Sequence, residues 1–316
     1  MKAVFLDFST LGPDLDVSAM QALLPQLELY DMTDSAQLGE RVRGAEIVLT
    51  NKVRLNAPLF ADNPSLKFIG LTATGTDNVD LQAAQQHGIA VCNIRDYCTQ
   101  SVAEHVFGCL LNLTHNLGRY RETVAAGEWQ KAENFCLMSY PIRELSGLTL
   151  GIVGYGALGN GVAKIAKAFG MTVIVSARPG STEVQPDRVA FDDLLQQADV
   201  ISLHCPLTAS TQGLFGDREF ARMKRGAILI NTARGGLIDS AALVAALDSQ
   251  DIAAAVDVLP HEPPVNGDPL LDYDGHNLLV TPHIAWGTVK ARQAAVDQLT
   301  ECVAAFLSGE TLNRVI

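Results

Sequence analysis

Residues 149–159 read TLGIVGYGALG, an apolar run that ends in three glycines with the spacing G-x-G-x-x-G. The run is typical of a buried strand, and the segment that follows, NGVAKIAKAFG, is typical of an amphipathic helix. In such a turn, Gly154 permits the tight bend, Gly156 lets a pyrophosphate approach the backbone, and Gly159 lets helix and strand pack closely. The stretch therefore predicts a dinucleotide site at the helix start, formed by Gly154, Gly156, Ala157, Leu158 and Gly159. A plain tight turn is the alternative.

Outward from this turn, apolar runs alternate with helical patterns through nearly the whole chain. After residue 145 the runs lie at 149–154, 172–177, 200–205, 227–233, 253–258 and 278–283. Before it they lie at 3–8, 46–50 and 67–73. Such alternation predicts parallel sheets covered by helices on both faces. Because the pattern restarts once, we expect an α/β protein with two doubly wound, Rossmann- or flavodoxin-like domains and a cleft between them.

The domain boundary is expected in a long helical pattern at 101–127, which has few breakers and would cross from the first domain to the second. A last amphipathic pattern at 289–310 follows the final strand and would return to the first domain. We therefore predict a substrate-binding domain at 1–100 plus 286–316 and a dinucleotide-binding domain at 101–285. The cleft between domains is the default place for an active site.

Composition excludes several classes of protein. Of the 316 residues, 48% are hydrophobic and 18% are charged, which is typical of a globular enzyme and not of a disordered chain. The formal net charge of −12 would repel a phosphodiester backbone, so we expect no nucleic-acid partner. An anionic substrate would need a local positive site. The apolar runs are too short to span a membrane, and MKAVFLDF at the start resembles a strand and not a signal peptide, so we expect a cytoplasmic protein.

The six cysteines indicate neither a disulfide framework nor a metal site. They form no C-x-x-C pair and no Cys/His cluster with zinc spacing. We interpret them as reduced, mostly buried thiols and predict no metal.

Charged side chains follow three of the expected strands in the second domain. Arg234 lies in NTARGG, Asp257 and Glu262 lie in AVDVLPHEPP, and His283 lies in TPHIAW. Taken singly, the arginine, glutamate and histidine have ordinary interpretations as a surface cation, a solvated acid and a structural histidine. Because the carboxyl ends of parallel strands meet at one sheet edge, we expect them instead to converge beside the dinucleotide site.

These motifs resemble those of the D-isomer-specific 2-hydroxyacid dehydrogenases. The resemblance covers essentially the whole chain and rests on GIVGYGALG, LHCPLTAST, INTARGGLID, DVLPHEPP and TPHIAW, in that order. The segments YCTQSVAEHVFG and YPIRELSGLTLGIVGYG are most similar to the glycerate dehydrogenase and hydroxypyruvate (glyoxylate) reductase branch. The resemblance implies that Arg234, Glu262 and His283 are the catalytic residues.

The chemistry of these three side chains agrees with that assignment. Reduction of a 2-oxo acid needs a hydride, which a nicotinamide supplies, together with a proton donor and a cation. A histidine has an ordinary pKa of about 6.5, which suits His283 to give a proton to the carbonyl oxygen. Glu262 would accept the other ring N–H, and Arg234 would pair with the substrate carboxylate and polarise the carbonyl.

Further contacts follow from the resemblance. For the substrate it implies Thr74 and Gly75, in a turn that we expect to open a helix capped by Asp77. Lys52 and Trp286 are further substrate-site candidates, with a solvated lysine and core packing as the alternatives. For the cofactor the implied residues are Val102, Cys205, Pro206, Thr211, Thr232, Ala233 and Asp257. His204 is interpreted as structural.

The choice of cofactor depends on the stretch VIVSARPGS, residues 173–181. An NAD-preferring protein of this kind carries an acid at the end of the second strand, and that place falls on Ala177. The next residue, Arg178, suits a 2′-phosphate, and Ser176, Ser181 and Thr182 offer hydroxyl groups. The stretch favours NADP over NAD, with stacking of Arg178 on the adenine as the alternative.

Together these observations predict NAD(P)H-dependent reduction of hydroxypyruvate and glyoxylate to D-2-hydroxy acids. Alternative substrates are phosphoglycerate, lactate and phosphite, although the chain leaves no room after residue 316 for a regulatory domain. A non-catalytic dinucleotide sensor is the alternative from another class of protein. Apolar residues in GEWQKAENFCLMSYP, together with the family's mode of assembly, predict a homodimer formed through 101–140.

Overall fold

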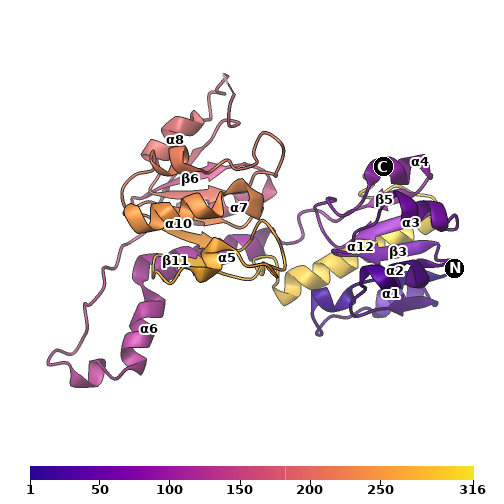
Figure 1. Cartoon of the computed structure of the whole chain (residues 1–316), viewed down its shortest axis with the longest axis horizontal. Coiled ribbons are helices and arrows are strands. Elements are labelled where there is room, and N and C mark those ends of the chain that lie inside the picture. The colour runs from indigo at the N-terminus through magenta and orange to yellow at the C-terminus, as the bar shows by residue number, and fades with distance from the viewer. Residues whose placement is uncertain (182) are drawn as a thin grey trace. The chain divides into compact units, whose positions relative to one another are not determined.

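A computed structural model describes residues 1–181 and 183–316 and divides into two compact units (Figure 1). Unit 1 comprises Met1–Cys98 and Gly287–Ile316, and unit 2 comprises Thr99–Trp286. Each unit holds one parallel sheet with helices on both faces, which confirms the predicted α/β class. The functions assigned above to the two parts of the chain stay predictions.

The sheet of unit 1 has the strand order β2-β1-β3-β4-β5, and all its pairs are parallel. Its strands are β1 (Ala3–Phe5), β2 (Leu27–Leu29), β3 (Ile47–Thr50), β4 (Phe68–Leu71) and β5 (Ala90–Cys92). The order reverses direction between β1 and β3, and a doubly wound sheet binds its ligands beside such a reversal. The sequence patterns had indicated only β1, β3 and β4 of these strands, and β2 and β5 were missed.

Alternate residues of these strands pack against helices on opposite faces of the sheet. Val4, Val48 and Ile69 contact a layer formed by α2 (Ser35–Val42), α3 (Ala57–Asp62) and α4 (Leu81–Gln86). The other face is covered by α1 (Ser18–Leu23) and α12 (Val289–Ser308), and Phe306 of α12 packs on Phe68. A short 3-10 helix, η1 (Phe8–Leu11), follows β1.

The sheet of unit 2 has the order β11-β10-β9-β8-β6-β7, again with every pair parallel. Its strands are β6 (Thr149–Val153), β7 (Thr172–Val175), β8 (Val200–Leu203), β9 (Ile228–Asn231), β10 (Ala253–Val256) and β11 (Leu278–Val280). They form where the apolar runs after residue 145 predicted strands. The direction reverses between β6 and β8, directly at the glycine turn.

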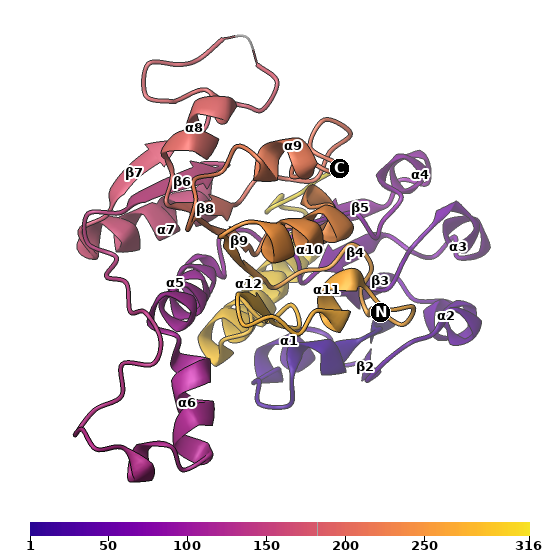
Figure 2. The same cartoon turned by 60° about the vertical axis from the view of Figure 1, so that its left-hand side comes forward.

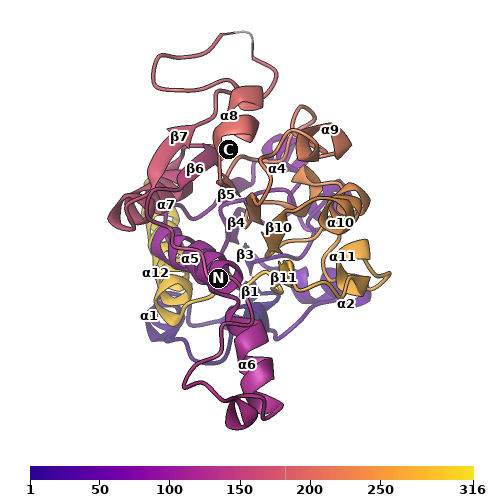
Figure 3. The ribbon, with the colours of Figure 1, turned by 90° about the vertical axis from the view of Figure 1, so that its left-hand side faces the viewer.

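Two helices, α5 (Thr99–His115) and α7 (Ala157–Ala168), pack side by side on one face of this sheet (Figure 3). The other face packs against α8 (Phe191–Gln197), α9 (Asp217–Phe220), α10 (Ser240–Ser249) and α11 (Pro269–Asp272). A short 3-10 helix, η3 (Gly235–Leu237), follows β9. These layers bury the β-strands and leave their carboxyl ends to carry the site.

The long helix expected over 101–127 is in fact two helices. The first, α5, ends at His115, and α6 (Leu117–Ala125) begins after Asn116, whose φ of 51° lies in the left-handed region. Asparagine tolerates that conformation better than most residues, and its side chain here donates a hydrogen bond of 2.7 Å to the carbonyl of Pro141. Figure 2 shows α6, η2 (Trp129–Lys131) and the following loop standing out from unit 2. We call residues 117–143 the arm.

Candidate active site

The turn after β9 carries Arg234 and is held by hydrogen bonds from the side chain of Asn231. The amide of Asn231, which is fully buried, donates to the carbonyl of Arg234 at 2.9 Å and accepts from the N–H of Ala233 at 3.0 Å. The next residue, Gly235, lies so close to the chain after β10 that a Cβ there would be 2.0 Å from the carbonyl carbon of Leu259. The turn of Arg234 and the loop that bears Glu262 are therefore packed directly together.

His283 and Glu262 form the central pair of the site. Nδ1 of His283 lies 2.5 Å from Oε2 of Glu262, while Oε1 of the same carboxylate accepts the N–H of Leu259 at 2.8 Å. The His283 side chain is 28% exposed and the Glu262 side chain 33% exposed, so water reaches the pair only in part. Because Nδ1 of His283 is bonded to the Glu262 carboxylate, Nε2 is the ring nitrogen that can face a reactant.

The loop that carries His283 is held by the buried carboxylate of Asp257. That carboxylate accepts the hydroxyl of Thr281 at 2.5 Å and the N–H groups of Ile284 and Ala285 at 2.9 and 2.8 Å. Nε2 of His105, on α5, lies 3.1 Å from the same Thr281 hydroxyl. His283 itself has a φ of 55°, and its N–H donates to the carbonyl of Asp257 at 2.7 Å. These hydrogen bonds fix the backbone at His283.

Next to the pair lies a cavity of about 390 Å³ with largely apolar walls. Leu259, Leu271 and Val280 contribute to these walls together with Pro263 and Pro264. These apolar walls keep water from competing for the hydrogen bond between His283 and Glu262.

The glycine turn fits a dinucleotide. Gly154 has a φ of +96°, and a Cβ there would be 2.5 Å from the main-chain nitrogen of Cys205. A Cβ on Gly159 would be 2.2 Å from the carbonyl oxygen of Gly154, so both positions require glycine. At Gly156, the N-cap of α7, a Cβ would meet nothing within 4 Å, and Ala157 beside it is exposed. Open space above the amino end of a helix is what an anionic pyrophosphate needs.

A buried hydroxyl at the end of β9 also fits a cofactor. The hydroxyl of Thr232, just past β9, is buried and has no hydrogen-bond partner among the described residues. Ala233 beside it is buried, and Pro206, past β8, is exposed. Val102 and Cys205 are largely buried, and the hydroxyl of Thr211 already donates to the carbonyl of Pro206 at 2.8 Å. For these last three, the predicted contribution to a cofactor site is therefore mainly shape.

The sequence of the second unit matches one family. Residues 107–285 match the profile of the NAD-binding domain of D-isomer specific 2-hydroxyacid dehydrogenases. This chain belongs to that family. A glycerate dehydrogenase from Methylorubrum extorquens is 44% identical over 99% of this chain and 98% of its own. A hydroxypyruvate reductase from Blautia hydrogenotrophica is 38% identical over 100% of this chain and 99% of its own. The crystal structure of the TT0316 protein from Thermus thermophilus has a TM-score of 0.87 and 34% identity, with full coverage of both chains.

These matches confirm the family that the motifs predicted, and with it an oxidoreductase that carries a nicotinamide dinucleotide domain. For a 2-hydroxyacid dehydrogenase, the pairing of His283 with Glu262 is a chemically sensible proton-transfer unit, and Arg234 is the cation on the neighbouring turn. The individual roles of these three residues stay predictions, as do the cofactor contacts.

In unit 1 of this dehydrogenase, Lys52, Thr74 and Gly75 follow the adjacent strands β3 and β4 at one sheet edge. The buried carboxylate of Asp7 fixes the first loop by accepting the N–H of Lys52 at 2.6 Å. The carbonyl of Thr74 accepts the amide of Asn93 at 2.7 Å. Their part in substrate binding stays a prediction. In unit 2, Nε1 of Trp286 donates to the carbonyl of His283 at 3.0 Å, so the indole is tied to the catalytic loop.

The helix expected after Asp77 begins later, at Leu81. Its N-cap is Asp80, whose carboxylate accepts the N–H of Ala83 at 2.9 Å. Asp77 and Asn78 instead form a turn, in which the N–H of Val79 donates to the carbonyl of Thr76 at 3.0 Å, and Val79 then forms a parallel bridge with Leu55. The prediction of Asp77 as the cap was therefore wrong.

Some residues of the site were not singled out from the sequence. His105 and Thr281 join the Asp257 network only because α5 packs beside the end of β11, and sequence spacing does not reveal this. The one available signal was a histidine within the apolar pattern of 101–127. His204 lies outside the site. Its Nε2 is 2.8 Å from the hydroxyl of Ser202, and burial lowers the pKa of His204 to about 4.

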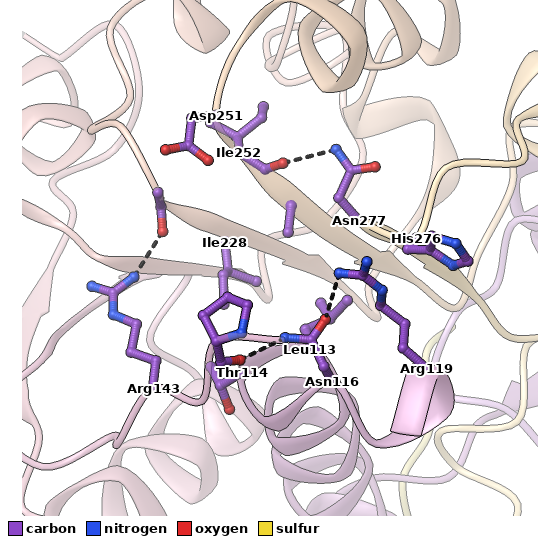
Figure 4. Close-up of a pocket in the computed structure, with 13 residues that line it drawn as sticks. Leu113, Thr114, Asn116, Arg119, Arg143, Ile228, Asp251, Ile252, His276 and Asn277 are labelled. Carbon is purple, nitrogen blue, oxygen red and sulfur yellow. Dashed lines mark hydrogen bonds between the residues drawn. The ribbon is translucent and has the colours of Figure 1, made fainter. Parts of the chain in front are cut away.

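A cavity of about 460 Å³ lies at the opposite ends of the strands in unit 2 (Figure 4). Ile228 and Ala253, the first residues of β9 and β10, line it together with Thr114, Arg119 and Arg143. Because Arg234 and His283 follow the carboxyl ends of their strands, this cavity is not part of the candidate active site.

All six cysteines are free. Over residues 1–181 and 183–316, no three His, Cys, Asp or Glu side chains are grouped in a way that would hold a metal ion. Within the same residues, no helix is long and apolar enough to cross a membrane.

Proposed function

We propose that this dehydrogenase reduces hydroxypyruvate and glyoxylate to the D-2-hydroxy acids and prefers NADPH. The observation that carries the proposal is the 2.5 Å pairing of His283 Nδ1 with Glu262, on a loop braced by Asp257. The full-length similarity to a glycerate dehydrogenase and a hydroxypyruvate reductase supports the substrate class.

The chain's own residues divide the work. When bound, the nicotinamide supplies the hydride. His283, as the imidazolium, donates its Nε2 proton to the substrate carbonyl oxygen, and Glu262 stabilises the positive ring through Nδ1. Arg234 pairs with the substrate carboxylate and polarises the carbonyl. In the oxidative direction, His283 takes the proton back.

The cofactor is proposed to lie along the glycine turn, with its pyrophosphate above Gly156 and the start of α7. The residues proposed to hold the rest of it are Val102, Ala157, Leu158, Ser176, Arg178, Cys205, Pro206, Thr211, Thr232, Ala233 and Asp257. Ala177, at the place of the acid in NAD-preferring proteins, neither holds a ribose diol nor repels a phosphate. Arg178 next to it is exposed and lines a cavity at the end of β7.

We also propose a cytoplasmic homodimer assembled through 101–140. Support for the dimer comes from the arm, on which Trp129, Phe135 and Met138 are exposed although they are large and apolar.

The test of the activity is a panel of 2-oxo acids assayed with NADPH and with NADH. Hydroxypyruvate and glyoxylate should have the highest kcat/KM, and NADPH should be preferred for both. If phenylpyruvate or pyruvate is the best substrate, the proposed substrate class is wrong, whereas a preference for NADH would overturn the cofactor alone. Phosphoglycerate and phosphite, assayed in the oxidative direction, test the remaining alternatives.

A further inference from the structure

A second arginine lies beside Arg178 at the end of β7. Arg188, ten residues further along the chain, lines the same cavity of about 390 Å³. The other residues that line this cavity are Ser176, Ala177, Ser181, Glu183 and Gln185. Nothing in the sequence pattern had connected Arg188 with a ligand.

The backbone holds Arg188 in this place. Ser176 and Val189 form a parallel bridge at the outer edge of the sheet. The N–H of Val189 donates to the carbonyl of Val175 at 2.9 Å, and the N–H of Ala177 donates to the carbonyl of Val189 at 2.7 Å. The residue after Arg188 is therefore fixed to the end of β7, and Arg188 lines the same cavity as Ala177, the position at which an NAD-preferring protein would carry its acid.

The side chain of Arg188 is partly desolvated and not fully paired. It is 22% exposed, and its guanidinium carbon lies 5.2 Å from the ring centroid of Tyr155, within the glycine turn. Nε is buried and makes no hydrogen bond within the described part of the chain. The carboxylate of Asp187 is 3.5 Å from Nε, and its side chain is 73% exposed. A buried donor without a hydrogen bond is costly, so this group is prepared for an acceptor that arrives with a ligand.

The hydroxyl groups of the cavity are already engaged. Ser176 donates to the carbonyl of Ala177 at 2.6 Å, and Ser181 donates to the carbonyl of Glu183 at 2.9 Å. Thr182 lies outside the described residues. The serine hydroxyls thus have no hydrogen left for a phosphate, and the carboxylate of Glu183 would repel one. The two arginines are the cations of the cavity.

We propose that Arg188 is a second ligand of the NADPH 2′-phosphate and, with Arg178, determines the cofactor preference. This inference rests on the proposed use of NADPH. A 2′-phosphate offers three oxygens and nearly two negative charges, enough to pair with two guanidinium groups. The 2′-hydroxyl of NADH carries no negative charge to pair with these two guanidinium groups. Arg188 is fixed by the bridge, and the exposed Arg178 approaches the phosphate from the solvent side.

The experiment measures binding of two adenosine probes by calorimetry, without catalysis. Adenosine 2′,5′-bisphosphate contains the 2′-phosphate, and adenosine 5′-monophosphate lacks it. Proteins to compare are the wild type, R178A, R188A, R188K and R225A. Arg225 is 88% exposed and pairs with Asp251, so R225A controls for the loss of one positive charge.

R188A should weaken binding of the bisphosphate by about 10- to 100-fold, as expected for a lost charged hydrogen bond. The same variant should change binding of the monophosphate by less than about threefold. R188K should fall between R188A and wild type, because lysine keeps the charge but not the two-pronged geometry. R225A should behave as wild type. Retained monophosphate binding also shows that each variant is folded.

The outcomes separate the two proposals. If the wild type binds both probes equally, the proposed NADPH preference is wrong and Arg188 has no phosphate to bind. If R178A loses the bisphosphate selectively but R188A does not, NADPH preference stands and the role of Arg188 is wrong. A loss in R188A that is equal for both probes would mean that Arg188 only supports Tyr155 and the adenosine, which also overturns the inference.

Discussion

At the scale of single residues, the proposed mechanism depends on His283 as the proton donor. Replacing it with alanine should lower kcat by about 100- to 10,000-fold, the usual contribution of a positioned acid. The cofactor dissociation constant should hardly change, since the proposed role is proton transfer. The matched control is H261A, which removes an exposed histidine next to Glu262. Steady-state kinetics and cofactor titration check both, and near-normal turnover of H283A would exclude His283 from the mechanism.

A second prediction concerns His204 and the stability of the fold. Burial lowers the pKa of His204 to about 4, below the ordinary value of about 6.5. As the pH falls, His204 is therefore protonated near pH 6.5 in the unfolded chain but only near pH 4 in the folded protein. The neutral histidine costs nothing above that window, and stability is lost as the pH falls through it, by up to about 3 kcal/mol.

Urea unfolding of wild type and H204N between pH 7 and pH 4 tests this. The asparagine cannot take up a proton, so the unfolding free energy of the variant should fall less steeply with decreasing pH. Parallel curves for the two proteins would contradict the prediction.

Residues that follow strands could be identified from the sequence, because each strand end is marked by an apolar run. Arg234, Glu262 and His283 were found in this way. Arg188 could not be, since it lies in an irregular segment, and the bridge between Ser176 and Val189 that holds this segment to β7 has no sequence signal. His105 escaped for a similar reason, because helix packing and not spacing brings it to Thr281.

At the scale of elements, the buried carboxylate of Asp257 connects the end of β10 with the loop after β11. D257N would keep the shape but present an amide N–H₂ to a main-chain donor at Ile284 or Ala285. Loss of hydrogen bonds to a buried charge should lower the unfolding free energy by about 2–3 kcal/mol. It should also reduce kcat, because the backbone of His283 is no longer fixed.

D251N is the control, since Asp251 is 65% exposed and its surface pair contributes little. Unfolding curves and kcat for both variants give the answer. Unchanged stability in D257N would contradict the brace, and a large loss of cofactor affinity would then show that Asp257 acts only as a cofactor ligand.

The elements themselves were predictable where an apolar run marks them. The six strands of unit 2 and β1, β3 and β4 of unit 1 were indicated in this way, whereas β2 and β5 were missed because their three residues did not stand out as separate apolar runs. The break between α5 and α6 was missed as well. The helical pattern continues through Asn116, and the sequence does not show that its side chain bonds to Pro141 in a later loop, which supports its left-handed conformation.

At the scale of the whole molecule, the charge is strongly unbalanced, with 35 acidic and 23 basic residues. A chain of this kind attracts an anionic substrate only through local cations. Arg234, on the turn after β9, is the cation proposed for the substrate, and the arginines at the end of β7 are those proposed for the phosphate of the cofactor.

The arm provides the last prediction, that the protein is a homodimer. Phe135 is 90% exposed and Met138 is 78% exposed, and exposed apolar groups of this size indicate an interaction surface. In a two-fold dimer the same residues are covered on both chains, so their loss counts twice. Light scattering of the wild type should give twice the mass of one chain, and F135D/M138D should shift it towards one chain. V265D is the matched control, because Val265 is equally apolar and 82% exposed but lies outside the arm. A wild-type mass of one chain, or dissociation by V265D as well, would contradict assembly through the arm.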